Sequence, residues 1–265
     1  MADRRGAGRV FVWLEPLEFE RAAARLTPTA TRVLGHIVAR MNLRSLRCDD
    51  SQAEIVEMLS SNGRRASRHA VADAMSRLLG SDPALVGKVG PGRYMLNPTV
   101  ITTGDPDQRS SLAAAWLRVT GEKAPSYPGR RGSMRLLKVS PSMLARACAA
   151  LSPQQLRVLA CMLSNMDRSK NLVAMSQREM ISAMSGDGGP RTSFETVISA
   201  MRLLRCTDYD GRVHDYDPFD EPVVVKVDDA LYKVNPSFAY QGSLARYDQI
   251  AAQFLNAQVF KNREA

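Results

Sequence analysis

Hydrophobic residues recur every three or four positions along three segments of the first half of the chain. Such spacing places them on one face of a helix. Thr27 and Pro28 are typical of a helix start, with a hydroxyl as the N-cap and proline at the first helical position. Ser51 and Glu54 predict a capping box at the start of the second segment. The apolar positions of the first and third segments are Val33, Leu34, Ile37, Val38 and Met41, and Val71, Ala74, Met75 and Leu78.

The same pattern returns in the second half, which indicates an internal duplication. The segment LTPTATRVLGHIVARM begins at Leu26, and LSPQQLRVLACMLSNM begins at Leu151, 125 residues later. Further along, KVGPGRYMLNP resembles KVDDALYKVNP, and the offset is now 138 residues. We therefore divide the chain into a first unit of residues 10–119 and a second unit of residues 134–258, each interpreted as a domain. Between them, residues 120–133 are rich in proline, glycine and basic side chains and predict a linker.

Each unit is predicted to hold a short strand, helices and a β-hairpin. The apolar runs RVFVWLEP and MRLLKVSP predict the opening strands. After the third helix, two extended runs flank a turn, Gly90-Pro91-Gly92 in the first unit and Asp228-Asp229 in the second. The order helix, helix, turn, helix, β-hairpin is typical of a winged helix-turn-helix, although any three-helix bundle with a hairpin shows the same order. The sequence therefore predicts a mainly α fold with small β-hairpins (α+β), built as two duplicated winged helix-turn-helix domains.

The segment from the third helix through the hairpin carries a resemblance to a known family. Its end, GRYMLNP or LYKVNP, followed by a glycine six or seven residues beyond the Asn-Pro pair, resembles the winged-helix domain of plasmid replication initiator proteins. The two-unit layout is similar to the tandem winged-helix initiators, which bind repeated sites at plasmid origins. The acidic turn Asp228-Asp229 departs from a wing that grips DNA, so the resemblance does not imply equal roles for the two units.

Charge supports an acidic partner. The 265 residues include 36 Lys+Arg and 27 Asp+Glu, a formal net charge of +9, and nucleic acid is the commonest partner of such a basic chain. In a helix-turn-helix protein the third helix enters the major groove. The candidate contacts of the first unit, on this helix and its hairpin, are Arg64, Arg65, Ser67, Arg68, His69, Ala72, Asp73, Ser76, Lys88 and Arg93.

The second unit offers a less basic surface at the matching positions. Its candidate contacts are Arg191, Thr192, Ser193, Glu195, Ser199 and Arg202. We therefore expect the first unit to hold DNA more firmly. Basic arms are further candidates for the minor groove or the phosphates, namely Arg4 and Arg5 at the N-terminus and Arg130 and Arg131 in the linker. The alternative for all these arginines is a solvated turn or tail.

Catalytic and metal chemistry find little support in the sequence. Cys48, Cys148, Cys161 and Cys206 form no C-x-x-C pair, and the three histidines are scattered, so we expect no metal site and no cofactor. A phosphate-binding G-x-x-x-x-G-K-[ST] loop and a G-x-S-x-G elbow are both absent from the sequence, and we expect no catalytic residues and no enzyme activity. The acidic insertion at residues 206–222 is interpreted as a polar surface loop, with a divalent metal or a protein partner as alternatives.

The sequence thus predicts a protein that binds specific double-stranded DNA. The preferred role is a plasmid replication initiator or replicon control protein on repeated origin sites, acting as a homodimer or as further copies on those repeats. A transcriptional repressor with the same fold is the first alternative, and a non-catalytic adaptor whose winged helices bind protein is the second. The chain has no apolar run of the roughly 18 residues that a membrane span needs and no apolar signal-peptide core, so we expect a bacterial cytoplasmic location on nucleoid or plasmid, with no membrane partner.

Overall fold

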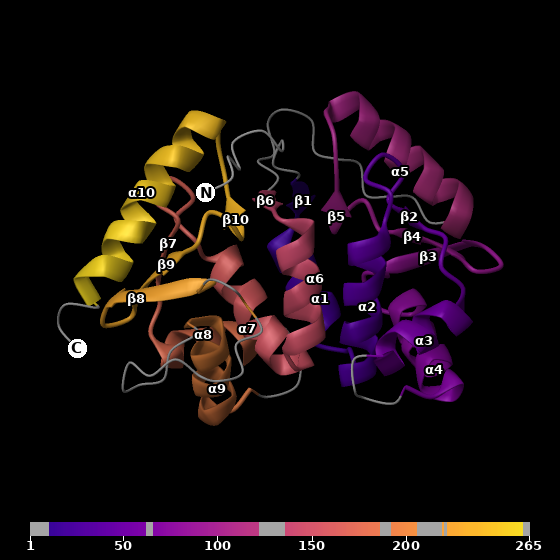
Figure 1. The fold of residues 1–265 in the computed structure, drawn as a ribbon, viewed down its shortest axis with the longest axis horizontal. Coiled ribbons are helices and arrows are strands. Elements are labelled where there is room, and N and C mark those ends of the chain that lie inside the picture. Colours follow the sequence, from indigo (N-terminus) through magenta and orange to yellow (C-terminus); the bar gives the residue numbers. More distant parts are fainter. Residues whose placement is uncertain are drawn as a thin grey trace.

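The computed structural model describes residues 11–61, 66–121, 136–185, 192–205, 219 and 222–261 (Figure 1). Over these residues the fold is mixed α+β, with ten helices and ten short strands. The strands form one four-stranded and two three-stranded antiparallel sheets. The predicted α+β class is confirmed.

The two units share one order of elements. The first unit contains β1 (Val12–Leu14), α1 (Pro16–Ala23), α2 (Pro28–Arg40), β2 (Arg47–Cys48), α3 (Gln52–Ser61), α4 (Arg68–Leu79), β3 (Val86–Gly90), β4 (Arg93–Leu96), β5 (Ile101–Thr102) and α5 (Pro106–Thr120). The second unit contains β6 (Leu137–Val139), α6 (Pro141–Ala150), α7 (Pro153–Ser164), β7 (Leu172–Ala174), α8 (Gln177–Ser185), α9 (Phe194–Arg205), β8 (Val224–Asp228), β9 (Leu231–Val234), β10 (Ala239–Tyr240) and α10 (Leu244–Lys261).

The duplication extends to local backbone geometry. In each unit the hairpin gains a third strand, giving sheet orders β2-β4-β3 and β7-β9-β8. Both hairpins carry a register shift at the same place, between Lys88 and Gly90 and between Lys226 and Asp228. Left-handed backbone recurs at matching positions: Leu46 has φ 56°, and Asn171, 125 residues later, has φ 51°. The two units are therefore copies of one backbone, and their differences in side chain can be compared position by position.

The predicted helix starts and core faces are present. Thr27 caps α2, and Ser152 forms a capping box with Gln155 at the start of α7. The backbone N–H of Glu54 donates to Ser51 Oγ at 3.3 Å, and the Ser51 N–H donates to Glu54 Oε2 at 2.6 Å. The predicted core faces of the third helices are buried, namely Val71, Ala74, Met75 and Leu78 on α4, and Val197, Ala200, Met201 and Leu204 on α9.

The Asn-Pro motif has a structural role in both units. Asn97 Nδ2 donates to the Ala84 carbonyl at 2.6 Å, while its Oδ1 accepts from the Thr99 N–H at 2.9 Å. Asn235 makes the matching pair of bonds to the Pro222 carbonyl and the Ser237 N–H, at 2.9 and 2.8 Å. Because each asparagine ties the end of the second hairpin strand to the loop before the first, the motif closes the hairpin.

The two units are joined through a shared sheet with order β10-β6-β1-β5. At its centre Trp13 pairs with Lys138, its own counterpart 125 residues later. Val12 pairs with Val139, the counterpart of Leu14, so exchanging the two units reproduces the pairing. The helices obey the same exchange, because α1 packs on α7 and α2 packs on α6. The units are therefore related by an internal pseudo-twofold axis, like the subunits of a symmetric dimer.

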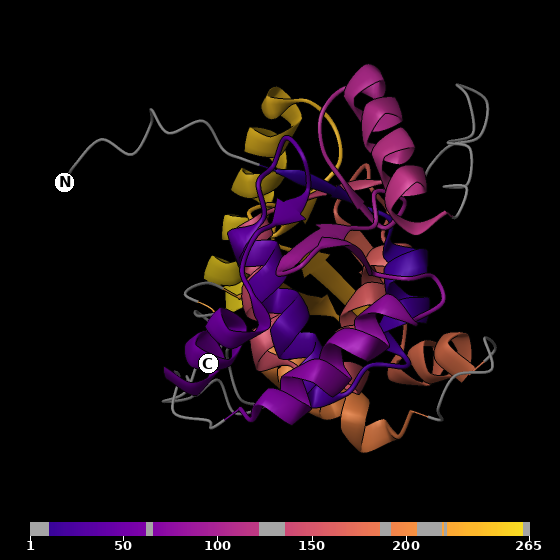
Figure 2. The same cartoon turned by 90° about the vertical axis from the view of Figure 1, so that its right-hand side faces the viewer.

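This arrangement places equivalent elements at the same end of the molecule. In Figure 1, α4 and α9 both lie at the lower end, with α5 and α10 at the upper end, and the view turned by 90° shows the same separation (Figure 2). One continuous hydrophobic core runs through both units. The predicted boundary at residues 120–133 thus divides the sequence repeats, while the packing unites them.

Candidate nucleic-acid interface

Helix α4 presents a polar face to solvent. Its core side is anchored as predicted, so Arg68, His69, Asp73 and Ser76 are exposed and Ala72 is half-buried. The first turn holds two residues with basic side chains and no acidic one. A helix N-terminus already attracts anions, and cations there are disfavoured in the free protein. The basic residues of this turn therefore do not stabilise the helix itself, but they can bind an anionic partner at its N-terminus.

Several predicted contacts on α4 have local partners. Ser67 Oγ caps the helix by accepting from the Ala70 N–H at 3.1 Å. Asp73 pairs with Arg77 at 3.0 Å, one turn further along. Ser76 Oγ donates to the carbonyl of the half-buried alanine one turn before it, at 3.0 Å. Ser67, Asp73 and Ser76 thus stabilise the helix itself, and the strongest candidates for contacts to a partner are Arg68 and His69.

The first hairpin adds cations beside this helix. Lys88 on β3 and Arg93 at the start of β4 are both exposed. Arg93 Nε lies 3.7 Å from Asp49 Oδ1, and both side chains are mostly exposed, at 67% and 71%. An exposed pair of this kind contributes little stability. Arg93 can therefore exchange the carboxylate for another anion at small cost.

Helix α9 differs from the prediction at its start. Thr192 is only 6% exposed, and its Oγ1 donates to Gln154 Oε1 at 3.2 Å. The expectation that it faces a partner is therefore wrong, because the chain entering α9 turns this hydroxyl onto α7. Ser193 caps α9 by accepting from the Thr196 N–H at 3.1 Å. Ser199 Oγ accepts from Gln155 Nε2 of α7 at 2.8 Å, and this hydroxyl likewise serves the fold.

The exposed surface of α9 is mixed in character. Glu195 and Arg202 face solvent as predicted. Phe194, which the prediction omitted, is 48% exposed and follows Arg68 at the offset of 126 residues that relates these two helices. The sequence feature that points to Phe194 is the replacement of a cation, Arg68, by an aromatic ring at the matching position.

The second hairpin is acidic at its tip. Asp228 and Asp229 are exposed. Lys226 Nζ lies 2.7 Å from Asp229 Oδ1, and this hydrogen bond holds the pKa of the Asp229 carboxyl below its ordinary value. Asp229 is thus ionised and paired with Lys226, while Asp228 adds a second exposed carboxylate, so the tip attracts phosphate less than Arg93 of the first unit does.

Some predicted residues lie outside the described part of the chain. They are Arg4, Arg5, Arg64, Arg65, Arg130, Arg131 and Arg191, together with the acidic insertion 206–222 except Phe219 and Pro222. Their contacts stay predictions.

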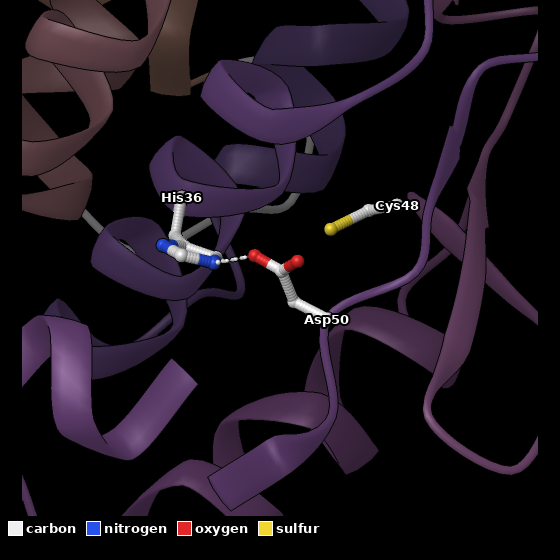
Figure 3. Close-up of side chains that lie close together, drawn as sticks. All are labelled: His36, Cys48 and Asp50. Carbon is white, nitrogen blue, oxygen red and sulfur yellow. Dashed lines mark hydrogen bonds and ion pairs between the residues drawn. The ribbon is translucent and has the colours of Figure 1, made fainter. Parts of the chain in front are cut away.

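A separate cluster of potential metal ligands lies in the first unit, between α2 and the segment that leads into α3. His36 on α2, Cys48 on β2 and Asp50 just before α3 place one donor atom each within 4.8 Å of one another (Figure 3). His36 Nε2 and Asp50 Oδ2 are hydrogen-bonded at 2.7 Å. The spacing of cysteines and histidines in the sequence does not reveal this group, because it holds one residue of each type and an aspartate, and only the fold brings His36 to the segment of Cys48 and Asp50.

Comparison of the chain with protein-family models, with curated proteins and with solved structures finds no match. Among the helices that the structure describes, none has the length and apolar character needed to cross a membrane.

Proposed function

We propose that each unit is a winged helix-turn-helix and that the chain binds specific double-stranded DNA without catalysing a reaction. The observation that carries the proposal is the twofold repetition of one order of elements: helix, strand, helix, helix, hairpin, with the first strand completing the hairpin sheet. In this fold the helix before the hairpin reads the major groove, and the hairpin is the wing. Helices α4 and α9 occupy that position and lie at one end of the molecule (Figure 1).

The first unit is proposed as the stronger DNA-binding half. Arg68 and His69 stand at the exposed start of α4, and Lys88 and Arg93 stand on the adjacent wing. Arginine suits both the guanine edge and the phosphates. The role that best accounts for a duplicated basic protein with this motif is initiator or control protein of a plasmid-like replicon, and a transcriptional repressor is the alternative.

A second function is favoured for the second unit by its exposed surface. Phe194 at the start of α9 is apolar and half-exposed, and the tip of the hairpin in this unit carries the two exposed carboxylates of Asp228 and Asp229. These are features of a surface that contacts protein or an apolar base edge more than phosphate. We therefore propose that the second unit adds a protein contact to its weaker part in DNA binding.

The test is a selection of binding sites from random double-stranded DNA with the full chain, followed by titrations of the selected site at several salt concentrations. Log affinity should fall steeply with log salt, because each neutralised phosphate releases counterions. A flat salt response, or the recovery of no preferred sequence, would contradict the proposal.

Two single variants, one of an exposed arginine on each of α4 and α9, locate the stronger unit. Arg68→Ala should weaken binding about tenfold or more, whereas Arg202→Ala, on the same kind of helix in the second unit, should weaken it less. Circular dichroism of both variants controls for folding. An equal or reversed loss would show that the second unit holds DNA at least as firmly as the first.

A further inference from the structure

We propose that His36, Cys48 and Asp50 form a binding site for a divalent transition-metal ion of the zinc class. The three residues provide an imidazole nitrogen, a thiol sulfur and a carboxylate oxygen, which are the ligand types that zinc prefers. Figure 3 shows the Cys48 sulfur and the His36 ring directed toward the Asp50 carboxylate from different sides. The three donors thus enclose one point from three directions.

The distances fit an ion after small movements. Zinc lies about 2.0–2.3 Å from such ligands, so two donors of a tetrahedral site lie roughly 3.3–3.6 Å apart. The three donor atoms lie within 4.8 Å of one another, and the closest pair, His36 Nε2 and Asp50 Oδ2, is 2.7 Å apart. Inserting an ion therefore replaces the hydrogen bonds of His36 and Arg40 to Asp50 Oδ2 and requires shifts of about 1 Å.

The second unit provides an internal control for this cluster. The positions equivalent to His36, Cys48 and Asp50, each 125 residues later, are Cys161, Val173 and Met175. All three are buried, in a backbone of the same order and geometry. Since the fold forms there without the imidazole and the carboxylate, the polar trio of the first unit is not a requirement of the fold. The trio is thus specific to the first unit, as a ligand site of that unit would be.

The surroundings leave a fourth coordination position open. Cys48 is buried, and the side chains of His36 and Asp50 are 7% and 18% exposed. Arg40 Nε lies 3.3 Å from Asp50 Oδ2, and its side chain is 62% exposed, so it can turn into solvent when an ion neutralises the carboxylate. Three protein ligands would leave one position of the ion open to water, in contrast to closed four-ligand structural sites.

Binding is expected to release a proton from the sulfur. Metal ions bind the thiolate, and affinity therefore depends on displacing this proton. The bound ion would connect α2, β2 and the start of α3.

The experiment titrates the full chain, under reducing conditions, with cobalt(II) and then with zinc. We expect one cobalt per chain, a near-ultraviolet charge-transfer band from a cobalt–thiolate bond, displacement of that band by zinc, and a higher Tm in zinc because the ion binds the native state. Absence of the band together with an unchanged Tm would overturn the proposal.

Variants assign the ligands. Cys48→Val introduces the residue that the second unit has at this position and should abolish the band. Asp50→Asn keeps a hydrogen-bond acceptor for His36 and should weaken binding tenfold or more. Cys148→Ala removes a buried thiol outside the cluster and should leave the band unchanged, with circular dichroism confirming the fold of each variant. A band that persists in Cys48→Val, or disappears in folded Cys148→Ala, would place the metal elsewhere and overturn the assignment.

Discussion

Glu54 and Glu179 each complete a capping box at the start of an exposed helix. Hydrogen bonds from Ser51 and from Ser176 hold the pKa of these carboxyl groups below its ordinary value. A depressed folded-state pKa means that the stabilisation is present above the unfolded-state pKa and is lost as the pH falls through the folded-state pKa. Both helices should therefore lose their caps under acid conditions.

The prediction concerns the double variant Glu54→Gln and Glu179→Gln. Glutamine keeps the capping bond, as Gln155 does at the start of α7, but it does not titrate. The variant should lose less stability than the wild type between neutral pH and a pH below about 4.3, the ordinary glutamate pKa. Urea unfolding at both pH values measures the difference. Parallel losses in the two proteins would show that these caps do not contribute to acid sensitivity.

A buried ion pair connects the two units at the residue scale. Arg157 on α7 and Glu20 on α1 are 1% and 4% exposed, and Arg157 Nε lies 3.8 Å from Glu20 Oε1. Arg157 also donates through Nη2 to the Met184 carbonyl. The residue equivalent to Glu20 in the second unit is Ala145, and the residue equivalent to Arg157 in the first unit is Arg32, which is less buried. The ion pair therefore breaks the internal symmetry.

Removing one partner should leave a buried charge. Glu20→Ala, which copies Ala145, should destabilise the protein by about 3–5 kcal/mol. Adding Arg157→Met should restore much of that loss, because an apolar pair of similar volume needs no countercharge. Chemical denaturation of the two single variants and the double variant measures the coupling. A double variant as unstable as Glu20→Ala would show that lost packing, and not uncompensated charge, dominates.

At the scale of elements, the crossing of α2 and α6 depends on a glycine. A Cβ at Gly35 would lie 2.7 Å from the Ala145 carbonyl oxygen and 3.1 Å from Cys148 Cβ. Because the nearest atom belongs to backbone, the helices would have to move apart. Gly35→Ala should therefore lower the free energy of unfolding, because overpacking costs about 1–3 kcal/mol. The better helix propensity of alanine offsets at most about 1 kcal/mol of this loss. A rise in the free energy of unfolding, measured with urea, would contradict the close contact.

The elements that the sequence predicted well are those with a local signal. A helix cap such as Thr27, and the buried face of a helix such as the one with Val71, are determined by residues a few positions apart. Both are present in the structure as predicted. Strands β2 and β7 were not predicted, because two or three residues show no period and form only when the hairpin offers a partner. Thr192 was misplaced for a related reason, since its burial depends on contact with α7.

At the scale of the whole molecule, the duplication was evident in the sequence but the joining of the units was not. The pairing of Trp13 with Lys138 has no local signal, because it brings together strands from opposite halves of the chain. The cluster of His36, Cys48 and Asp50 was also not predicted, although comparison of the two units points to these positions: Cys48 stands where its copy has Val173. Differences between copies therefore carry information that motif spacing does not.

The pseudo-twofold axis predicts the arrangement of the DNA site, provided that the chain binds DNA as proposed. A rotation that exchanges the units also exchanges α4 and α9, so their N-terminal ends would meet the duplex in opposite directions. Dimers with this symmetry read inverted half-sites about 10 base pairs apart, centre to centre. One chain should therefore read two inverted half-sites. The halves should differ in sequence, because α4 begins with Arg68 and α9 begins with Phe194.

Reversing one half of the selected site tests this arrangement. With spacing and composition kept constant, the direct orientation should bind at least tenfold more weakly than the inverted one, since each mismatched base pair costs about 1–3 kcal/mol. Repeated sites in an origin would then be repeats of the whole asymmetric site, each occupied by one chain. Equal affinity for the two orientations would mean that one unit alone reads bases. The second unit, with its acidic wing, would then be the one that binds a protein partner.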